Sequence, residues 1–245
     1  MEITALKLSK TNCFLIKNHN KYVLVDTGYE FEWALFSKRL REAGVDLSEI
    51  SHLILTHHHD DHCGLLNKIV ERNPDIRIIM SNLAEGPLKN GQNYHTPGSG
   101  HVNRRIHFIL SLKQKVDKKW THTFPPYLIR KNDILITKET TLKEIGIDLN
   151  GKIIATPGHS LDGISILFDD GDCIMGDAAA NFLQFAGTKY CIISIDNLDE
   201  CYENWRKIIA GDAQQIFPAH GKPFNVEKLK KNLGKNKKKN MVLFN

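Results

Sequence analysis

The chain has 245 residues, of which 41% are hydrophobic and 25% are charged, with a formal net charge of +5; these values fit an ordinary globular protein rather than a disordered or fibrous one. No apolar run approaches the roughly 20 residues of a membrane span, and the N-terminus lacks the basic and apolar regions of a signal peptide, so we expect a cytoplasmic protein with no membrane span. The cysteines are odd in number and form no CxxC pair, so we expect reduced thiols rather than a disulfide framework at Cys13, Cys63, Cys173, Cys191 and Cys201.

The first third of the chain predicts a layered α/β pattern. Short apolar runs typical of strands alternate with segments that carry apolar side chains at helical spacing, and "DTG" at 26–28 marks a turn. The expected elements are, in order, strands at 12–16 and 22–25, a helix at 31–44, a strand at 52–56, a helix at 64–73 and a strand at 76–80. This β-β-α-β-α-β order is typical of an α/β fold.

Residues 84–130 differ in composition from what precedes them. Glycine, proline, asparagine and histidine are frequent on either side of 104–116, a run that fits a strand or a helix. We interpret the segment as an insertion that folds over a site as a lid. A structural excursion or a contact in a homodimer is the alternative.

Strand-like runs resume after the insertion. The "DDGD" at 169–172 is a hairpin turn signal, and 198–212 is an amphipathic helix with its apolar side chains on one side. The expected strands lie at 133–137, 141–147, 152–156, 163–168, 173–176 and, after the helix, 213–220.

The positive charge is concentrated in residues 228–245, which hold seven lysines and no acid. Subtracting these seven from the net +5 leaves −2 for residues 1–227, so the body of the chain is slightly acidic. A basic tail can bind nucleic acid or an anionic membrane, but no aromatic residues interleave with the lysines to stack against bases, so we expect a solvated, frayed terminus. We therefore expect one domain over 1–227, with the insertion at about 84–130, followed by the basic tail.

The segment "THHHDDHCG" at 56–64 directly follows an apolar strand. A strand would place His57, His59 and Asp61 on one face with His62 opposite, and a helix would align only residues 57 and 61. A tight loop can gather all four, with His57 and His59 on one ion and Asp61 and His62 on a second. Imidazole and carboxylate ligands of this kind suit Zn²⁺, Fe or Mn²⁺.

An ion held by two histidines needs a further ligand. Three candidates follow later apolar runs beside glycine or proline, namely His159, Asp177 and His220. Such turns at strand ends are where α/β folds place their chemistry.

The pattern H-x-H-x-D-H, followed by separate His, Asp and His at strand ends, resembles the metallo-β-lactamase superfamily of metal-dependent hydrolases. The resemblance runs from the early "DTG" to "PAHG" at 218–221. It implies a four-layered αβ/βα sandwich with two metal ions at one edge of the sheets. It also implies the ligands, which are His57, His59 and His159 for the first ion, Asp61, His62 and His220 for the second, and Asp177 between them.

The resemblance further implies an activity. Two divalent ions, Zn²⁺ before Fe or Mn²⁺, would share a hydroxide that cleaves a small ester, thioester, lactone or amide, with Asp61 also orienting the nucleophile. The best-known β-lactamases have a cysteine where this chain has Asp177, so it is more similar to the thioesterase, lactonase and phosphodiesterase branches.

Three alternatives stay open at this point. One is a phosphodiesterase or nuclease whose anionic substrate the basic tail helps to hold. Another is an iron-dependent sulfur or oxygen oxidoreductase, because some members of the superfamily use iron. The third is a non-catalytic binding protein on the same scaffold, although such a protein need not keep all seven ligand positions.

Three further polar residues lie beside the expected ligands. We expect His58 to point away from the ions and to bond a neighbouring group, and Asp60 to face solvent. Asp26 in "DTG" fits either a carboxylate that orients a metal-bound histidine or a residue that forms the turn.

Overall fold

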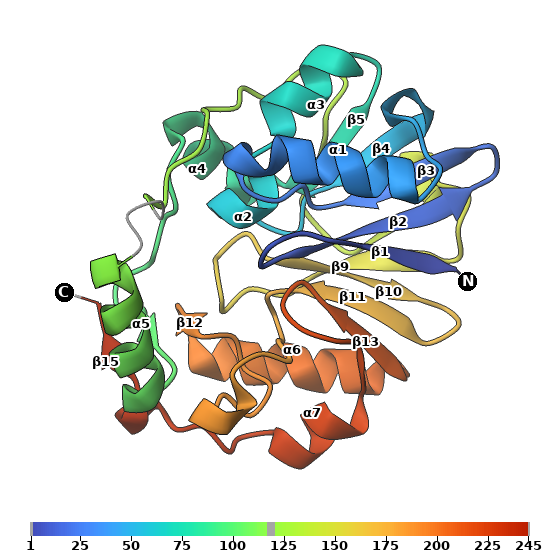
Figure 1. The fold of residues 1–245 in the computed structure, drawn as a ribbon. Coiled ribbons are helices and arrows are strands. Elements are labelled where there is room, and N and C mark those ends of the chain that lie inside the picture. The colour runs from blue at the N-terminus through green and yellow to red at the C-terminus, as the bar shows by residue number, and fades with distance from the viewer. Residues whose placement is uncertain (1, 117–120, 245) are drawn as a thin grey trace.

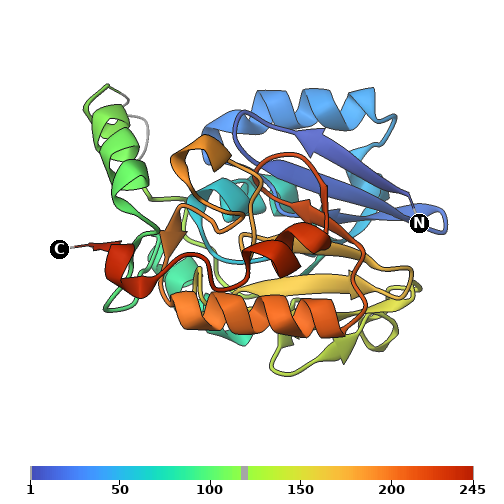
Figure 2. The ribbon, with the colours of Figure 1, turned by 90° about the horizontal axis from the view of Figure 1, so that it is seen from below.

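The computed structural model describes residues 2–116 and 121–244. Two six-stranded sheets pack face to face, and helices cover the outer face of each (Figures 1 and 2). The layers therefore run helix, sheet, sheet, helix, which confirms the four-layered αβ/βα sandwich expected from the sequence. None of the helices in the described residues is both long enough and apolar enough to cross a bilayer.

The first sheet begins as an antiparallel meander and continues as a parallel sheet. Its strands, in spatial order, are β1 (Ile3–Lys7), β2 (Asn12–Asn18), β3 (Lys21–Val25), β4 (Ile50–Ile54), β5 (Arg77–Ser81) and β7 (Ile134–Ile136). The helices of this half are α1 (Trp33–Glu42), α2 (Asp60–Cys63), α3 (Leu66–Arg72) and α4 (Glu85–Asn90). The helix expected at 64–73 is present as α3, and the histidine cluster forms a separate short helix, α2, that the sequence did not predict.

The second sheet is covered by two helices from the C-terminal part of the chain, α6 (Leu198–Ala210) and α7 (Glu227–Asn232). Its strands, in spatial order, are β14 (Phe224–Asn225), β13 (Gln215–Pro218), β11 (Asp172–Gly176), β10 (Ile164–Phe168), β9 (Gly151–Ala155) and β8 (Thr140–Thr141). Short 3-10 turns occur at Glu30–Glu32, Leu47–Glu49, Asn82–Ala84, Lys143–Ile145, Gln184–Ala186 and Lys238–Asn240.

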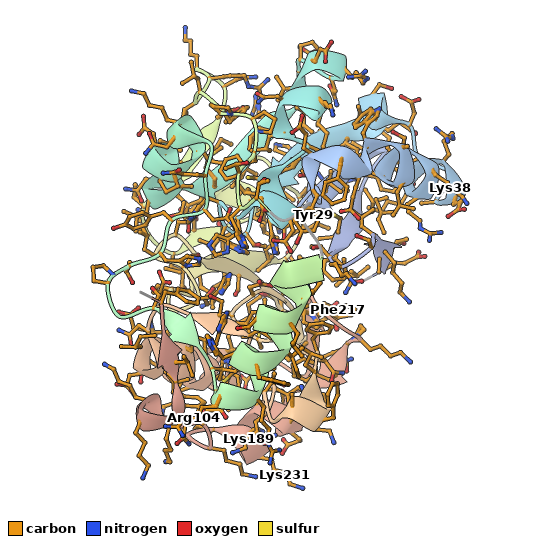
Figure 3. The ribbon with its side chains drawn as sticks, turned by 60° about the vertical axis from the view of Figure 1, so that its left-hand side comes forward. Tyr29, Lys38, Arg104, Lys189, Phe217 and Lys231 are labelled. Atoms are coloured by element: carbon orange, nitrogen blue, oxygen red, sulfur yellow. The ribbon has the colours of Figure 1, made fainter. Side chains whose placement is uncertain are left out.

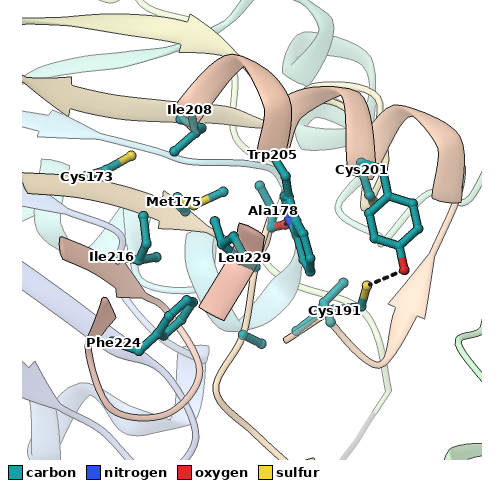
Figure 4. Packing of buried hydrophobic residues seen from close by; sticks show 14 of the residues in the cluster. Cys173, Met175, Ala178, Cys191, Cys201, Trp205, Ile208, Ile216, Phe224 and Leu229 are labelled. Carbon is teal, nitrogen blue, oxygen red and sulfur yellow. Dashed lines mark hydrogen bonds between the residues drawn. The ribbon is translucent and has the colours of Figure 1, made fainter. Parts of the chain in front are cut away.

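The alternation of side chains along each strand explains the layering. On β9 and β11, Ile153 and Ile174 face the first sheet, whereas Ile154 and Met175 face α6. Because successive side chains of a strand point to opposite faces, these continuous apolar runs bury both faces of the sheet. The packing on α6 is centred on Trp205, which is fully buried and donates its indole N–H to the Ala178 carbonyl at 2.8 Å (Figure 4).

The strand expected at 141–147 is wrong beyond its first residue. The Glu144 carboxylate accepts hydrogen bonds from both the backbone N–H and the hydroxyl of Thr141, each at 2.7 Å, and Gly146 takes a left-handed φ of 83°. These local bonds satisfy the backbone within a turn, so the segment does not extend the sheet.

The frayed C-terminal tail expected from the sequence is also wrong. Leu229 of α7 is fully buried, and β15 (Val242–Leu243) pairs with β6 (Gly100–His101), which also pairs with β12 (Ser194–Ile195). This small third sheet joins the tail to the 84–130 segment, where the run that fitted a strand or a helix forms α5 (Arg104–Val116). Figure 1 shows α5 beside β15 at one side of the sandwich, and Figure 2 shows α5 projecting from it.

All five cysteines are buried as free thiols, as the sequence predicts. Burial raises the pKa of the Cys173 thiol and of the Cys191 thiol, the latter to about 11. These side chains therefore pack as small apolar groups rather than as reactive thiolates.

We expect Trp205→Ala to lower the free energy of unfolding by about 3–5 kcal/mol, because it removes a fully buried aromatic side chain and leaves a cavity. Urea unfolding followed by circular dichroism measures the change. As a control, Leu128→Ala at a position that is 68% exposed should change it by less than about 0.5 kcal/mol. Equal effects of the two substitutions would contradict the assignment of Trp205 to the core between α6 and the second sheet.

Candidate metal centre

All seven residues expected as ligands lie where the chain leaves a strand or begins the helix after it. His57 and His59 follow β4, and Asp61 and His62 lie in α2 immediately afterwards. The remaining three are His159 after β9, Asp177 after β11 and His220 after β13. These positions come from four strand-to-loop junctions, one in the first sheet and three in the second, and the four junctions meet at one edge of the sandwich.

The structure brings three histidines together as a first group. His159 Nε2 lies 3.2 Å from His57 Nε2 and 2.8 Å from His59 Nδ1. The other ring nitrogen of His159, Nδ1, donates to the Ser194 carbonyl at 2.8 Å, so Nε2 presents a lone pair to the group.

A second group contains Asp61, His62 and His220. His62 Nε2 lies 3.6 Å from Asp61 Oδ1, and His220 Nε2 lies 3.3 Å from Asp61 Oδ2. One potential ligand atom from each of the three residues falls within 4.8 Å of the others, as it does in the first group.

Asp177 lies between the two groups and presents one oxygen to each. Its Oδ2 is 3.3 Å from His159 Nε2, whereas its Oδ1 is 3.3 Å from His220 Nε2 and 3.7 Å from His62 Nε2. A carboxylate in this position can bind two cations at once, one through each oxygen.

The donor atoms suit divalent cations. His59 Nε2, His62 Nε2 and Asp177 Oδ1 are buried without a hydrogen-bond partner among the described residues. Buried polar atoms are costly unless paired, and lone pairs that face each other across 2.8–3.2 Å repel unless a positive charge lies between them. The residues present therefore fit the imidazole and carboxylate sites that hold Zn²⁺, Fe or Mn²⁺.

The electrostatics of the two groups differ. Burial lowers the pKa of His57 and of His59 well below the ordinary value, and their histidine neighbours lower it further, so both rings are neutral near pH 7. In the second group burial lowers the pKa of His220, but the carboxylates of Asp177 and Asp61 outweigh it and raise the pKa to about 10. Burial raises the pKa of Asp61, yet His62 and His220 lower it to about 2. The carboxylates of Asp61 and Asp177 therefore give the second group a negative charge that favours the binding of cations.

Hydrogen bonds from outside the groups fix the orientation of each ring. Asp26 Oδ2 accepts from His62 Nδ1 at 2.8 Å, and both oxygens of this carboxylate accept from Thr56. His220 Nδ1 donates to the Lys10 carbonyl at 2.9 Å, and Thr11 donates its hydroxyl proton to Asp61 at 2.8 Å. Asp26 therefore orients a histidine and also forms the turn, since its φ is +60°. Lys10 and Thr11 carry no sequence signal that would have found them.

His58 points away from the two groups, as expected. Its Nδ1 donates to Asp162 at 2.8 Å, and its Nε2 accepts the backbone N–H of Tyr94 at 3.0 Å. Asp162 lies three residues after His159, and that spacing was the only available signal for it.

The expectation that Asp60 faces solvent is wrong. Asp60 is buried, its backbone N–H donates to Asn93 Oδ1 at 2.9 Å, and its carboxylate accepts from Asn93 Nδ2 at 2.8 Å. Asp60 begins α2, where a carboxylate is favoured by the helix dipole, and the 84–130 segment covers it.

Comparison with known proteins agrees with this geometry. The model of the metallo-beta-lactamase superfamily matches residues 6–220. The lactamase-like protein adaB of Aspergillus niger is 32% identical over 119 residues, which are 43% of this chain and 37% of that protein. The atrochrysone carboxyl ACP thioesterase of Aspergillus terreus is 29% identical over 117 residues, 42% of this chain and 36% of that protein. The chain thus spans less than two fifths of the length of either relative.

Among solved structures, BJP-1, a subclass B3 metallo-beta-lactamase of Bradyrhizobium japonicum, superposes with a TM-score of 0.64 at 16% identity. The match covers 96% of this chain and 87% of that one, which shows a shared fold. Because the family model spans most of the sequence and the fold agrees over nearly all of it, the chain belongs to the metallo-beta-lactamase superfamily, a superfamily of metal-dependent hydrolases.

Proposed function

We propose that this protein is a dinuclear metal-dependent hydrolase that acts on a thioester. The observation that carries the proposal is Asp177, whose two oxygens face two separate groups of buried donor atoms. The first ion would be held by His57, His59 and His159, the second by Asp61, His62 and His220, with Asp177 shared by both. Zinc is the first candidate for these nitrogen and carboxylate ligands, before iron and manganese.

Two divalent cations in these positions would acidify a water molecule and polarise the carbonyl oxygen of the substrate. The protein's own residues keep the ligand atoms deprotonated and correctly oriented. Neutral rings at His57 and His59 keep their lone pairs free, and Asp26 keeps His62 in the tautomer that exposes Nε2. Asp61 is fixed by the Thr11 hydroxyl, and through its oxygen Oδ1 it would orient the attacking water.

A thioester is favoured among the substrates of this superfamily by the curated relatives. Proteins named as acyl carrier protein thioesterases match this chain at 29–31% identity over 117 residues. Asp177 agrees with this choice, because the thioesterase branch that the sequence resembles has a carboxylate at the bridging position.

The described parts of the 84–130 segment, residues 84–116 and 121–130, would enclose the substrate as a lid, and residues 117–120 lie outside what the structure describes. Three of its residues bond neighbours of the proposed ligands. Asn93 pairs with Asp60, the Tyr94 N–H donates to His58, and Ser99 donates at 2.7 Å to Asp196, whose own N–H bonds the Gly158 carbonyl beside His159. His95 also lies with its ring 5.4 Å from that of His59. While they are in place, these contacts would exclude water beside the first ion.

Asp177→Asn should lower the metal content of the purified protein below the two ions per chain proposed for the native protein. It should also lower thioester hydrolysis by more than about 100-fold, beyond the 10–100-fold typical of residues that only support a ligand. Plasma mass spectrometry and a thiol-release assay provide the two readouts. His19→Ala, at an exposed histidine paired with Asp148, serves as the control and should change neither. Full metal content in Asp177→Asn would contradict the bridging role.

Asp26→Asn should weaken binding of the second ion by about 10–100-fold, because the amide keeps the shape of the carboxylate but not the charge that orients His62. Competition with a chromogenic chelator measures the affinity. Asp148→Asn is the matched control, since that carboxylate accepts from a histidine at the surface, 2.7 Å from His19. An unchanged chelator titration in Asp26→Asn would reject this role.

Asn93→Ala should increase hydrogen exchange of the backbone at 92–99 by about tenfold, because it removes both bonds that join Asn93 to Asp60. Exchange in α6 should stay unchanged and serves as the internal control. If exchange at 92–99 does not rise, these bonds do not hold the proposed lid.

A further inference from the structure

A second pocket lies outside the metal centre and is strongly cationic. Its volume is about 480 Å³, and its walls come from the start of α5, from 186–189 and from the tail at 236–240. Among the residues that the structure describes, four basic side chains line it, namely Arg104, Arg105, Lys189 and Lys239, and no aspartate or glutamate does. Figure 3 shows Arg104 and Lys189 together at the end of the molecule away from Lys38.

The described part of the chain offers these four cations no acidic partner. Across residues 2–116 and 121–244, no carboxylate makes an ion pair with any of them, and the Lys189 ammonium donates to the Lys235 carbonyl at 3.0 Å. Residues 1–227 carry a slightly negative net charge, so the basic side chains gathered here concentrate positive potential in one pocket. Such a pocket suits a phosphorylated ligand, because arginine and lysine both donate charge-assisted hydrogen bonds to phosphate.

The walls of the pocket are held in place by hydrogen bonds. Asn103 Nδ2 donates to the carbonyls of Ala186 and Gly187, both at 3.2 Å, and Asn103 Oδ1 accepts the N–H of Ile106 in the first turn of α5. The buried Asn236 donates to the Thr188 carbonyl at 2.7 Å. Three segments that are distant in sequence are therefore tied together before any ligand arrives, which lowers the entropic cost of binding.

An apolar pocket of about 400 Å³ adjoins the cationic one and shares Arg104 and Arg105 with it. Its other walls include Phe108 and Phe185, which are 64% and 78% exposed. Large exposed aromatic side chains beside arginines provide a surface on which a nucleobase can stack. The two pockets together match the two halves of a nucleotide, phosphates in one and base in the other.

A row of neighbouring rings leads from the metal centre to α5, the helix whose first turn lines both pockets. Ring centroids follow one another at 5.4 Å from His59 to His95, 5.0 Å to Phe244, 4.9 Å to His101 and 5.2 Å to His107. His107 belongs to α5, two residues after Arg105. The row therefore spans the distance from the proposed thioester site to the helix that bears the pockets.

We propose that the two pockets bind the nucleotide end of a coenzyme A thioester, with the phosphates on Arg104, Arg105, Lys189 and Lys239 and the adenine against Phe108 and Phe185. Acyl coenzyme A joins an adenine ring, three phosphate groups and a thioester in one molecule. A single phosphodiester, such as that of a carrier-bound pantetheine arm, would use only part of this charge. The thioester part of the inference rests on the proposed function, whereas nucleotide binding stands on the pockets alone.

The test measures coenzyme A binding to the full chain by isothermal titration calorimetry. Reversing two charges with Arg105→Glu and Lys239→Glu should weaken binding by about tenfold or more, because each loses a charge-assisted bond and adds repulsion. The matched control reverses two exposed charges elsewhere, Lys17→Glu and Lys38→Glu, and should leave binding unchanged. No binding of coenzyme A, or equal binding in both double variants, would overturn the inference.

A second variant separates the base from the phosphates. Phe185→Ala should weaken binding of coenzyme A but not of 4′-phosphopantetheine, which lacks the adenine. Equal loss for both ligands would overturn the stacking role.

Kinetics then separates this inference from the proposed function. In the Arg105→Glu, Lys239→Glu variant the KM for an acyl coenzyme A should rise by about tenfold or more, while hydrolysis of the matching acyl pantetheine stays unchanged. Specific coenzyme A binding without hydrolysis of either thioester would support the nucleotide site and contradict the proposed function. If the double variant hydrolyses both thioesters and its KM for acyl coenzyme A equals that of the native protein, the proposed function is supported and the nucleotide site is overturned.

Discussion

The convergence of imidazole lone pairs at the edge of the two sheets is the constraint on which the rest of the structure depends. His159 Nε2 lies within 3.2 Å of ring nitrogens from His57 and His59, in a buried site where water cannot screen the repulsion. Such a cluster is unfavourable for folding unless positive charge is bound there. The protein accordingly has its hydrogen bonds arranged to keep these atoms aimed at one another instead of letting them turn away.

The sandwich supplies that arrangement by packing the ends of strands from both sheets against each other. Gly176 shows how close the approach is, because a Cβ at this position would lie 2.7 Å from the Thr56 side chain, and its φ of +50° disfavours other residues. Thr56 in turn bonds Asp26, so the loop after β4, the turn after β3 and the end of β11 support one another. A change in any of these three turns would therefore be felt at Asp177 and His62 together.

The sequence predicts the α/β pattern and all seven candidate ligands because their signals are local, whereas the four-layered arrangement is implied only by the family resemblance. Apolar runs mark the strands, and histidine or aspartate directly after a run marks the edge of the sheet. The supporting residues are less visible. Thr11, Asn93 and Asp162 act across separations of 50, 33 and 104 residues, which no periodicity or short motif records. The predicted exposure of Asp60 is wrong for the same reason, because the segment that buries this residue lies over thirty residues away in the sequence.

The C-terminal tail illustrates a second limit. Its lysines dominate its composition and predict a solvated terminus, yet a few apolar residues decide its structure. Leu229 is buried against the α6 layer, and Val242 and Leu243 complete a small sheet with β6. Composition reports the exposed face of such a segment, whereas its position depends on the few side chains that it buries. The same tail brings Lys239 to the cationic pocket and Phe244 to the row of rings.

Anomalous X-ray diffraction from crystals of the protein with its native metal tests the central claim most directly. The account predicts two anomalous peaks, one among His57, His59 and His159, the other among Asp61, His62 and His220, with a different oxygen of Asp177 on each. Absence of anomalous density at this edge of the sheets, or peaks bound by other side chains, would contradict it.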